Sequence, residues 1–174
     1  MEKLCGCPRN GISVPGIGSK SLKVLMLGDV GNSEESLFQR AFSSRDGDLL
    51  KEYLDRAKIE QNLAGYYKAI SCFSDIKVNK ACIKYHEMQL HILINELKPK
   101  AIICFGPLSY RMLTFANKMQ SIQEMISKKF HYKSSLYECD AFCWYSPQFL
   151  LNSGNKYDIK TVNFFKTVKK CYLD

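Results

Sequence analysis

The sequence lacks any long apolar stretch. No run approaches the roughly 20 residues that a helix needs to cross a bilayer, and the opening segment MEKLCGCPRN contains no apolar signal-peptide core. Internal repeats, low-complexity tracts and linkers rich in Pro or Ser are also missing. The 174 residues are enough for one domain. We therefore expect a cytoplasmic protein without a membrane span, in which residues 1–174 form a single domain that acts as a monomer.

Acidic residues are scarce relative to basic ones. The chain has 17 Asp and Glu against 25 Lys and Arg, which gives a formal net charge of +8. This balance favours a polyanionic partner, with nucleic acid first, although a Lys-rich surface that serves only solubility would have the same count. Hydrophobic residues make up 46% and aromatic residues 12% of the chain, and these fractions argue against a disordered protein.

Short apolar runs alternate with stretches of helical periodicity. The apolar runs predict buried strands over residues 22–27, 65–71, 101–105 and 141–145. Apolar residues at helical spacing predict helices over residues 46–58, 82–97, 109–116 (with Pro107 at the start) and 159–171. Alternation of this kind predicts an α/β fold, a three-layer α/β/α sandwich with a mostly parallel central sheet.

The ligand site of such a sheet lies beyond the carboxyl ends of the strands. The loops that follow Leu27, Ser71 and Tyr145 are therefore the expected site. The first of these loops opens with Gly28 and Asp29. A glycine lets the backbone approach a ligand closely, and a carboxylate at a strand end could act on that ligand. Asp29 could equally be a helix N-cap or a turn former.

Eight cysteines are present, and four of them fall into two groups. Cys5 lies close to Cys7, and Cys72 lies close to Cys82. Four thiolates can hold a [4Fe–4S] cluster or a tetrahedral zinc ion, but four unrelated free thiols would show the same pattern. We expect the other four cysteines to be structural: Cys104, Cys139, Cys143 and Cys171.

Seven segments carry a resemblance to a known family. In chain order they are CGCPRN (5–10), VPGIG (14–18), VLMLGDVGNSEE (24–35), AF with DGDLL (41–50), YYKAISCF (66–73), ACIKYHEMQLHILINELKPKAIICFG (81–106) and YSPQFLL (145–151). In this order the chain resembles the uracil-DNA glycosylase superfamily and, within it, the iron–sulfur family 4 enzymes. The resemblance implies a three-layer α/β/α fold, DNA as the partner, and a [4Fe–4S] cluster on Cys5, Cys7, Cys72 and Cys82.

The resemblance also implies roles for residues of the expected site. Asp29 takes the place of the acidic residue that activates water. Phe42 takes the place of the aromatic residue that stacks on the extruded base, although it could be a core residue. Gly28, Val30 and Tyr145 complete the base-binding residues that match by position.

Several positions depart from the family pattern. Lys68 stands where the family has the Asn that reads uracil, and a lysine supplies hydrogen-bond donors only. Ser146 stands where the family has the His of a His-Pro-Ser motif, which donates to the base as negative charge builds there. Asp29 replaces the usual Glu in a loop that lacks its proline, and the pair Cys5 and Cys7 is C-x-C instead of C-x-x-C.

The resemblance implies a DNA glycosylase that extrudes a base and hydrolyses its N-glycosidic bond, with Asp29 and Ser146 as the catalytic residues. The expected substrate is uracil or a modified or deaminated base, because Lys68 and Ser146 argue against plain uracil specificity. The alternative is a catalytically silent relative that binds DNA or a repair or replication protein. We expect His86 and His91 to be packing or surface residues of the helix over 82–97.

Overall fold

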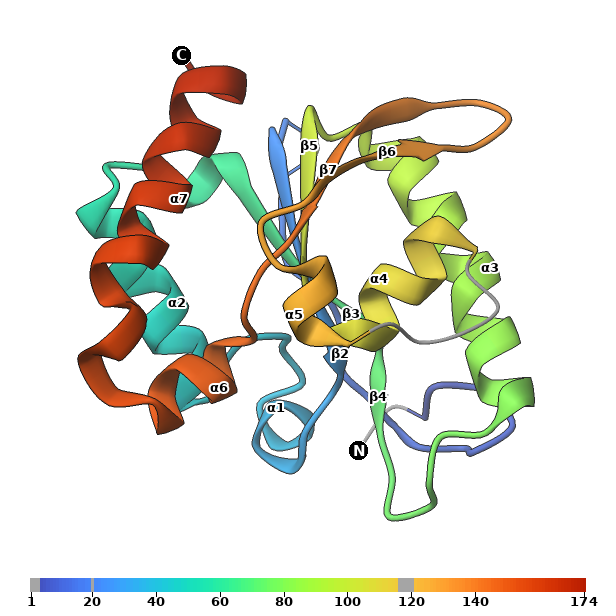
Figure 1. The fold of residues 1–174 in the computed structure, drawn as a ribbon. Helices are drawn as coiled ribbons and strands as arrows, with labels where there is room; N and C mark the ends of the chain where they lie inside the picture. The colour runs from blue at the N-terminus through green and yellow to red at the C-terminus, as the bar shows by residue number, and fades with distance from the viewer. Residues whose placement is uncertain (1–3, 20, 116–120) are drawn as a thin grey trace.

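A five-stranded sheet forms the centre of the structure (Figure 1). The structure is a computed structural model that describes residues 4–19, 21–115 and 121–174. The strand order is β3 (Ala64–Ile70), β2 (Val24–Val30), β5 (Ala101–Phe105), β7 (Glu138–Cys143) and β6 (Lys129–Lys133). The first four strands run parallel, and β6 pairs antiparallel with β7 at the edge. The predicted mostly parallel sheet is confirmed.

Helices cover both faces of this sheet (Figure 1). One face carries α2 (Arg45–Arg56), α6 (Pro147–Asn152) and α7 (Asp158–Tyr172), and the other carries α3 (Lys80–Leu97) and α4 (Pro107–Thr114). Successive residues of β2 point to opposite faces, so Met26 joins the core under α2 and α7 while Leu25 and Leu27 join the core under α3 and α4. The three-layer α/β/α sandwich is therefore confirmed, with apolar strands buried on both faces.

The predicted elements differ from the observed ones mainly at their ends. The helix predicted over 82–97 begins at Lys80, because the Asn79 side chain accepts a hydrogen bond from Cys82 N at 2.8 Å and caps it. The helix predicted over 109–116 is α4, and residue 116 lies outside the described residues. Strand β6 was not predicted, since its sequence KFHYK is mostly polar and largely exposed at the sheet edge. No described helix combines the length and the hydropathy that a membrane span requires.

A second, two-stranded sheet joins the N-terminal segment to the end of β3. In it, β1 (Ile12–Ser13) pairs antiparallel with β4 (Cys72–Phe73), which follows directly after Ser71. A hydrogen bond of 2.8 Å from Cys5 N to Gly11 O closes the preceding turn. The remaining short elements are α1 (Ser33–Leu37), α5 (Ile122–Met125), η1 (Gln61–Leu63) and η2 (Gly154–Tyr157).

Two isoleucines of α3 test how the outer helix is held to the sheet. Ile94 is fully buried, whereas Ile92 is 47% exposed. We expect Ile94→Ala to lower the free energy of unfolding by about 2–5 kcal/mol, because it removes buried methyl groups and leaves a cavity. Ile92→Ala, the control in the same helix, should change it by no more than about 0.5 kcal/mol. Equal losses in chemical denaturation would contradict the assigned packing of α3.

Candidate functional site

A pocket of about 300 Å³ opens at the carboxyl ends of the parallel strands. It is lined by Gly28, Asp29, Val30, Asn32, Phe42, Asp46, Lys68, Phe105, Gly106, Pro107, Ser146, Pro147 and Gln148. Six of the seven predicted catalytic and base-binding residues are in this set, although they come from separate segments of the chain. The parallel strands bring them together because all of these strands end at the same edge of the sheet.

Asp29 lies at the end of β2 and faces the N-terminus of α4. Its Oδ1 accepts hydrogen bonds from Ser109 N at 2.8 Å and Ser109 Oγ at 2.7 Å, and its Oδ2 accepts one from Leu108 N at 3.2 Å. Gly106 has a φ of +132°, and a Cβ there would collide with the Asp29 carboxylate. Asp29 is not the N-cap residue of α4, which is Gly106, but its carboxylate accepts hydrogen bonds from the first turn of that helix while it also lines the pocket.

The capping contacts leave Asp29 a limited capacity for chemistry. A carboxylate has about four lone-pair positions, and three of them are occupied by the donors of α4. Burial raises the pKa of the Asp29 carboxyl, while the hydrogen bonds from Ser109 and Leu108 and the charge of Lys68 oppose the rise. One lone pair therefore remains for a water molecule in the pocket.

Lys68 lines the pocket and forms a buried ion pair with Glu35, which does not line it. Its Nζ lies 2.8 Å from Glu35 Oε1, and the two side chains are 6% and 0% exposed. The same ammonium lies 4.1 Å from the centroid of the Phe42 ring, within cation–π range. Gly28 makes room for this arrangement, because a Cβ there would lie 2.9 Å from Lys68 Cδ and 3.0 Å from Phe42 Cζ.

Glu35 is a site residue that sequence reasoning missed. Its carboxylate accepts hydrogen bonds from Phe42 N at 2.7 Å and Asn32 N at 3.0 Å, besides the ion pair with Lys68. Asn32 in return accepts a hydrogen bond from Glu35 N at 2.8 Å, which completes a capping box on α1. The spacing N-x-x-E after the first glycine loop was the signal that could have located it.

Phe42 belongs to the core as well as to the pocket. It is 1% exposed, and its ring makes edge contacts with Tyr66 at 6.0 Å and Phe105 at 6.1 Å between centroids. Its backbone has a φ of +55°, which is unusual for a bulky residue. The hydrogen bond from Phe42 N to the Glu35 carboxylate holds this conformation.

The two predicted residues after β7 lie in different surroundings. Ser146 lines the pocket, and its Oγ accepts a hydrogen bond from Phe149 N at 3.2 Å as the N-cap of α6. Tyr145 does not line the pocket: its ring stacks on Phe149 at 5.0 Å and packs on Tyr157 at 4.7 Å. Lys160 Nζ lies 5.9 Å from the Tyr145 ring. This group forms an aromatic patch with a basic side chain next to the pocket.

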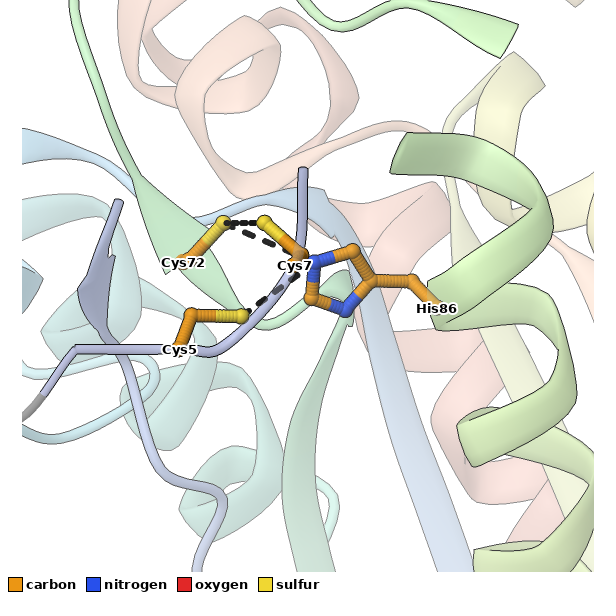
Figure 2. A group of neighbouring side chains, drawn as sticks. All are labelled: Cys5, Cys7, Cys72 and His86. Atoms are coloured by element: carbon orange, nitrogen blue, oxygen red, sulfur yellow. Dashed lines mark hydrogen bonds between the residues drawn. The ribbon is translucent and has the colours of Figure 1, made fainter. Parts of the chain in front are cut away.

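A second group of reactive side chains lies at the other side of β3. The sulfurs of Cys5, Cys7 and Cys72 and a ring nitrogen of His86 all lie within 4.8 Å of one another. Figure 2 shows these side chains turned toward one another. The two cysteines of the N-terminal segment reach this point because β1 pairs with β4. These four side chains could bind a metal ion.

The fourth member of this group differs from the predicted ligand. Cys82 was expected in the set and His86 was expected to be a packing or surface residue, but the structure places His86 with the three cysteines. The reason is the helix: Cys82 is in the first turn of α3, and His86, one turn later, points its ring at the thiols (Figure 2). Cys82 remains buried nearby, against Cys7 and Arg9.

Burial dominates the pKa of His86, Cys72 and Cys82, whereas at Cys7 hydrogen bonds outweigh burial and lower the pKa of the thiol. Burial lowers the pKa of His86 to about 4, so that its ring is neutral at physiological pH and has a lone pair to donate. Burial also raises the pKa of the Cys72 and Cys82 thiols. The Arg9 guanidinium opposes the rise in the pKa of Cys82, and a bound metal ion would favour the thiolate.

The ion pair of Lys68 and Glu35 can be compared with a more exposed ion pair that has the same nitrogen–oxygen distance. Lys51 Nζ also lies 2.8 Å from a carboxylate, that of Asp48, but there the side chains are 29% and 71% exposed. We expect Lys68→Met to lower the free energy of unfolding by about 3–5 kcal/mol, because the Glu35 charge stays buried without its partner. Lys51→Met should cost no more than about 1 kcal/mol. Chemical denaturation of the two variants measures the difference, and similar small losses would contradict a buried ion pair.

Comparison with known proteins identifies the family. A family model described as the uracil DNA glycosylase superfamily matches residues 15–170, which is most of the chain. No curated protein matches the chain. The match spans the whole central sheet and every residue that lines the pocket. With the three-layer fold and the pocket at its carboxyl edge, this match shows that the chain belongs to the uracil DNA glycosylase superfamily.

Proposed function

We propose that the protein is a DNA glycosylase that extrudes a base and hydrolyses its N-glycosidic bond, and that the base is uracil or a modified or deaminated base. The observation that carries the proposal is the pocket: in a member of this superfamily, Asp29, Lys68 and Ser146 line one cavity of about 300 Å³. We propose that the described residues, 4–19, 21–115 and 121–174, function together as a single domain.

Asp29 and Lys68 offer complementary charges to the two halves of the breaking bond. As the bond breaks, positive charge develops on the sugar and negative charge on the departing base. Asp29 can orient water with its remaining lone pair and stabilise the sugar, and the Lys68 ammonium can stabilise the base. Because Lys68 supplies donors only, the pocket favours a base edge that presents acceptors.

The surface next to the pocket supports a DNA partner. Tyr145, Phe149 and Tyr157 form the aromatic patch, and Lys156 Nζ lies 5.4 Å from the Tyr157 ring. Aromatic rings with neighbouring cations are suited to stacking on bases beside phosphates. The formal net charge of +8 adds the long-range attraction, which weakens as salt is added.

A specific observation favours a second candidate, a catalytically silent DNA-binding relative. Phe42 is 1% exposed, and the Lys68 ammonium lies 4.1 Å from its ring centroid. A base that stacked on this face of Phe42 would have to displace Lys68 from Glu35. In the silent relative this displacement does not occur, and the DNA is held only by the surrounding surface.

Substitution of Asp29 separates the two candidates. Asp29→Asn should lower the rate of base excision by about 10²- to 10⁴-fold, because the amide cannot act as a base toward water. The assay uses duplex and single-stranded oligonucleotides with uracil, hypoxanthine or modified cytosines, followed by alkaline cleavage. Glu52→Gln, which removes an exposed carboxylate of α2, is the control and should leave the rate unchanged. If the unaltered protein binds DNA and cleaves no substrate, the silent relative is the correct interpretation.

The pH dependence of excision tests the same carboxylate. The reaction needs ionised Asp29, and its pKa is raised by burial. The rate of the unaltered protein should therefore fall on acidification, and the fall should begin above the pH range in which an ordinary aspartate titrates. A rate that stays constant down to that ordinary range would remove Asp29 from the role.

Restoring the family residues tests the specificity. The double variant Lys68→Asn, Ser146→His should raise uracil excision by about 10²- to 10³-fold, since one well-placed donor is worth that much, and Asn pairs with both donors and acceptors of uracil. Each single variant serves as a control for stability, because Lys68→Asn also breaks the ion pair with Glu35. A folded double variant without gain on uracil would show that Lys68 and Ser146 do not set the base preference.

A further inference from the structure

The distances in the group of Cys5, Cys7, Cys72 and His86 carry information about what it binds. Cys7 Sγ lies 3.7 Å from Cys72 Sγ, and His86 Nε2 lies 3.5 Å from both Cys5 Sγ and Cys72 Sγ (Figure 2). Zn–S bonds of about 2.3 Å and Zn–N bonds of about 2.0 Å at tetrahedral angles put two sulfurs about 3.8 Å apart and a sulfur and a nitrogen about 3.5 Å apart. Three of the separations in the group match those of ligands around one ion, and all of the ligand atoms lie within 4.8 Å of one another.

The same separations do not fit the [4Fe–4S] cluster that the family 4 resemblance implies. Such a cluster binds each of its thiolates through a different iron atom, so its ligand sulfurs stand apart around the whole cluster. Two sulfurs 3.7 Å apart leave no space for this body between them. The fourth cysteine that the cluster needs, Cys82, is also outside the group, and an imidazole is in its place.

The surroundings of His86 support a ligand role. Its Nε2 faces the sulfurs, and its Nδ1 lies 3.4 Å from Ser71 Oγ. With Nε2 on a metal, Nδ1 carries the proton and donates to Ser71 Oγ, and an outer hydrogen bond of this kind orients a metal-bound histidine. Ser71 comes directly before Cys72. Two consecutive residues therefore supply one ligand, Cys72, and the hydrogen-bond partner of another ligand, His86.

Arg9 provides an independent indication of a buried negative charge. It is 5% exposed, and its Nη2 donates to Ser74 O at 3.2 Å. Its Nε and Nη1 are buried and form no well-directed hydrogen bond with the described residues, although the thiol of Cys82 lies against the guanidinium. A buried guanidinium with free donors needs an anionic partner. A zinc ion with three thiolates and one neutral imidazole carries a net negative charge beside it.

We infer that Cys5, Cys7, Cys72 and His86 hold a single tetrahedral zinc ion in a structural site, with Arg9 as the balancing charge. All four positions are filled by protein ligands, and such closed sites stabilise structure and do not activate water. The ion joins the N-terminal segment, the end of β3 and helix α3. The inference does not depend on the glycosylase proposal, because it concerns a site separate from the pocket.

Metal analysis of the full chain is the first test. The protein is purified without oxygen from cells supplied with both iron and zinc, and its metals and acid-labile sulfide are measured. We expect one zinc per chain and no sulfide. Four irons with four sulfides would overturn the inference, and so would a metal-free protein that fails to take up added Zn²⁺.

X-ray absorption at the zinc edge tests the ligand set without any substitution. Three sulfur neighbours and one nitrogen neighbour are expected at the distances typical of structural zinc. Four sulfurs would overturn the assignment of His86 and restore Cys82 as a ligand.

Two neighbouring positions on α3 make matched variants. His86→Ala should lose the zinc, and Cys82→Ser, at an equally buried position one turn earlier, should keep it. If His86→Ala does not fold, His86→Cys replaces it: this variant should keep one zinc and show four sulfur neighbours in the absorption spectrum. Loss of zinc from Cys82→Ser with retention in His86→Ala would overturn the inference.

Discussion

The buried carboxylate of Glu35 is the interaction on which the pocket depends. It accepts hydrogen bonds from Asn32 N and Phe42 N and forms the ion pair with Lys68. These three donors come from the start of the first loop, the end of that loop and the middle of β3. A buried charge is tolerated only when it is fully paired, so Glu35 requires all three segments to stay in place together. The left-handed backbone of Phe42 and the position of the Lys68 ammonium over its ring both follow from this requirement.

Strand β3 connects the two sites of the molecule. Lys68 points from this strand into the pocket, while Ser71 and Cys72, at its end, belong to the surroundings of His86. The backbone of Lys68 is fixed on one side by pairing with β2, opposite Gly28. The far end of the strand continues into β4, which pairs with the N-terminal segment. Whatever holds Cys5, Cys7, Cys72 and His86 together therefore also limits how β3 can move beside the pocket.

The departures from the family pattern form a coherent set in the structure. Lys68 is accommodated by the absence of a side chain at Gly28 and by the charge of Glu35, so it is more than a substitution in an unchanged pocket. Ser146 is engaged as the N-cap of α6, and Asp29 supports the N-terminus of α4. Each of these residues has a structural task along with its place in the pocket wall. The residues of the pocket therefore also hold the surrounding helices and strands in place, which the separate sequence motifs do not indicate.

The sequence by itself determined the layers and the edge at which the pocket lies. Continuous apolar runs such as AIICF can be buried only on both faces of a sheet, and parallel strands that alternate with helices must end at one edge. That reasoning located Gly28 and Asp29 at the end of a strand, whereas Val30, Phe42, Lys68 and Ser146 were predicted from the resemblance to the uracil-DNA glycosylase superfamily. It could not find β6, whose polar residues suit an exposed edge, or predict that Tyr145 would turn toward Phe149 and Tyr157.

Only the tertiary structure decided which side chains complete each site. Glu35 is fully paired only when Lys68 of β3 packs against the loop that holds Asn32 and Phe42, and His86 joins the three cysteines because the turn of α3 after Cys82 packs beside their thiols. Both outcomes depend on the angle at which one element meets another. The sequence shows how long each side chain is, but it does not show the angle at which two elements meet. Packing against the rest of the molecule sets this angle.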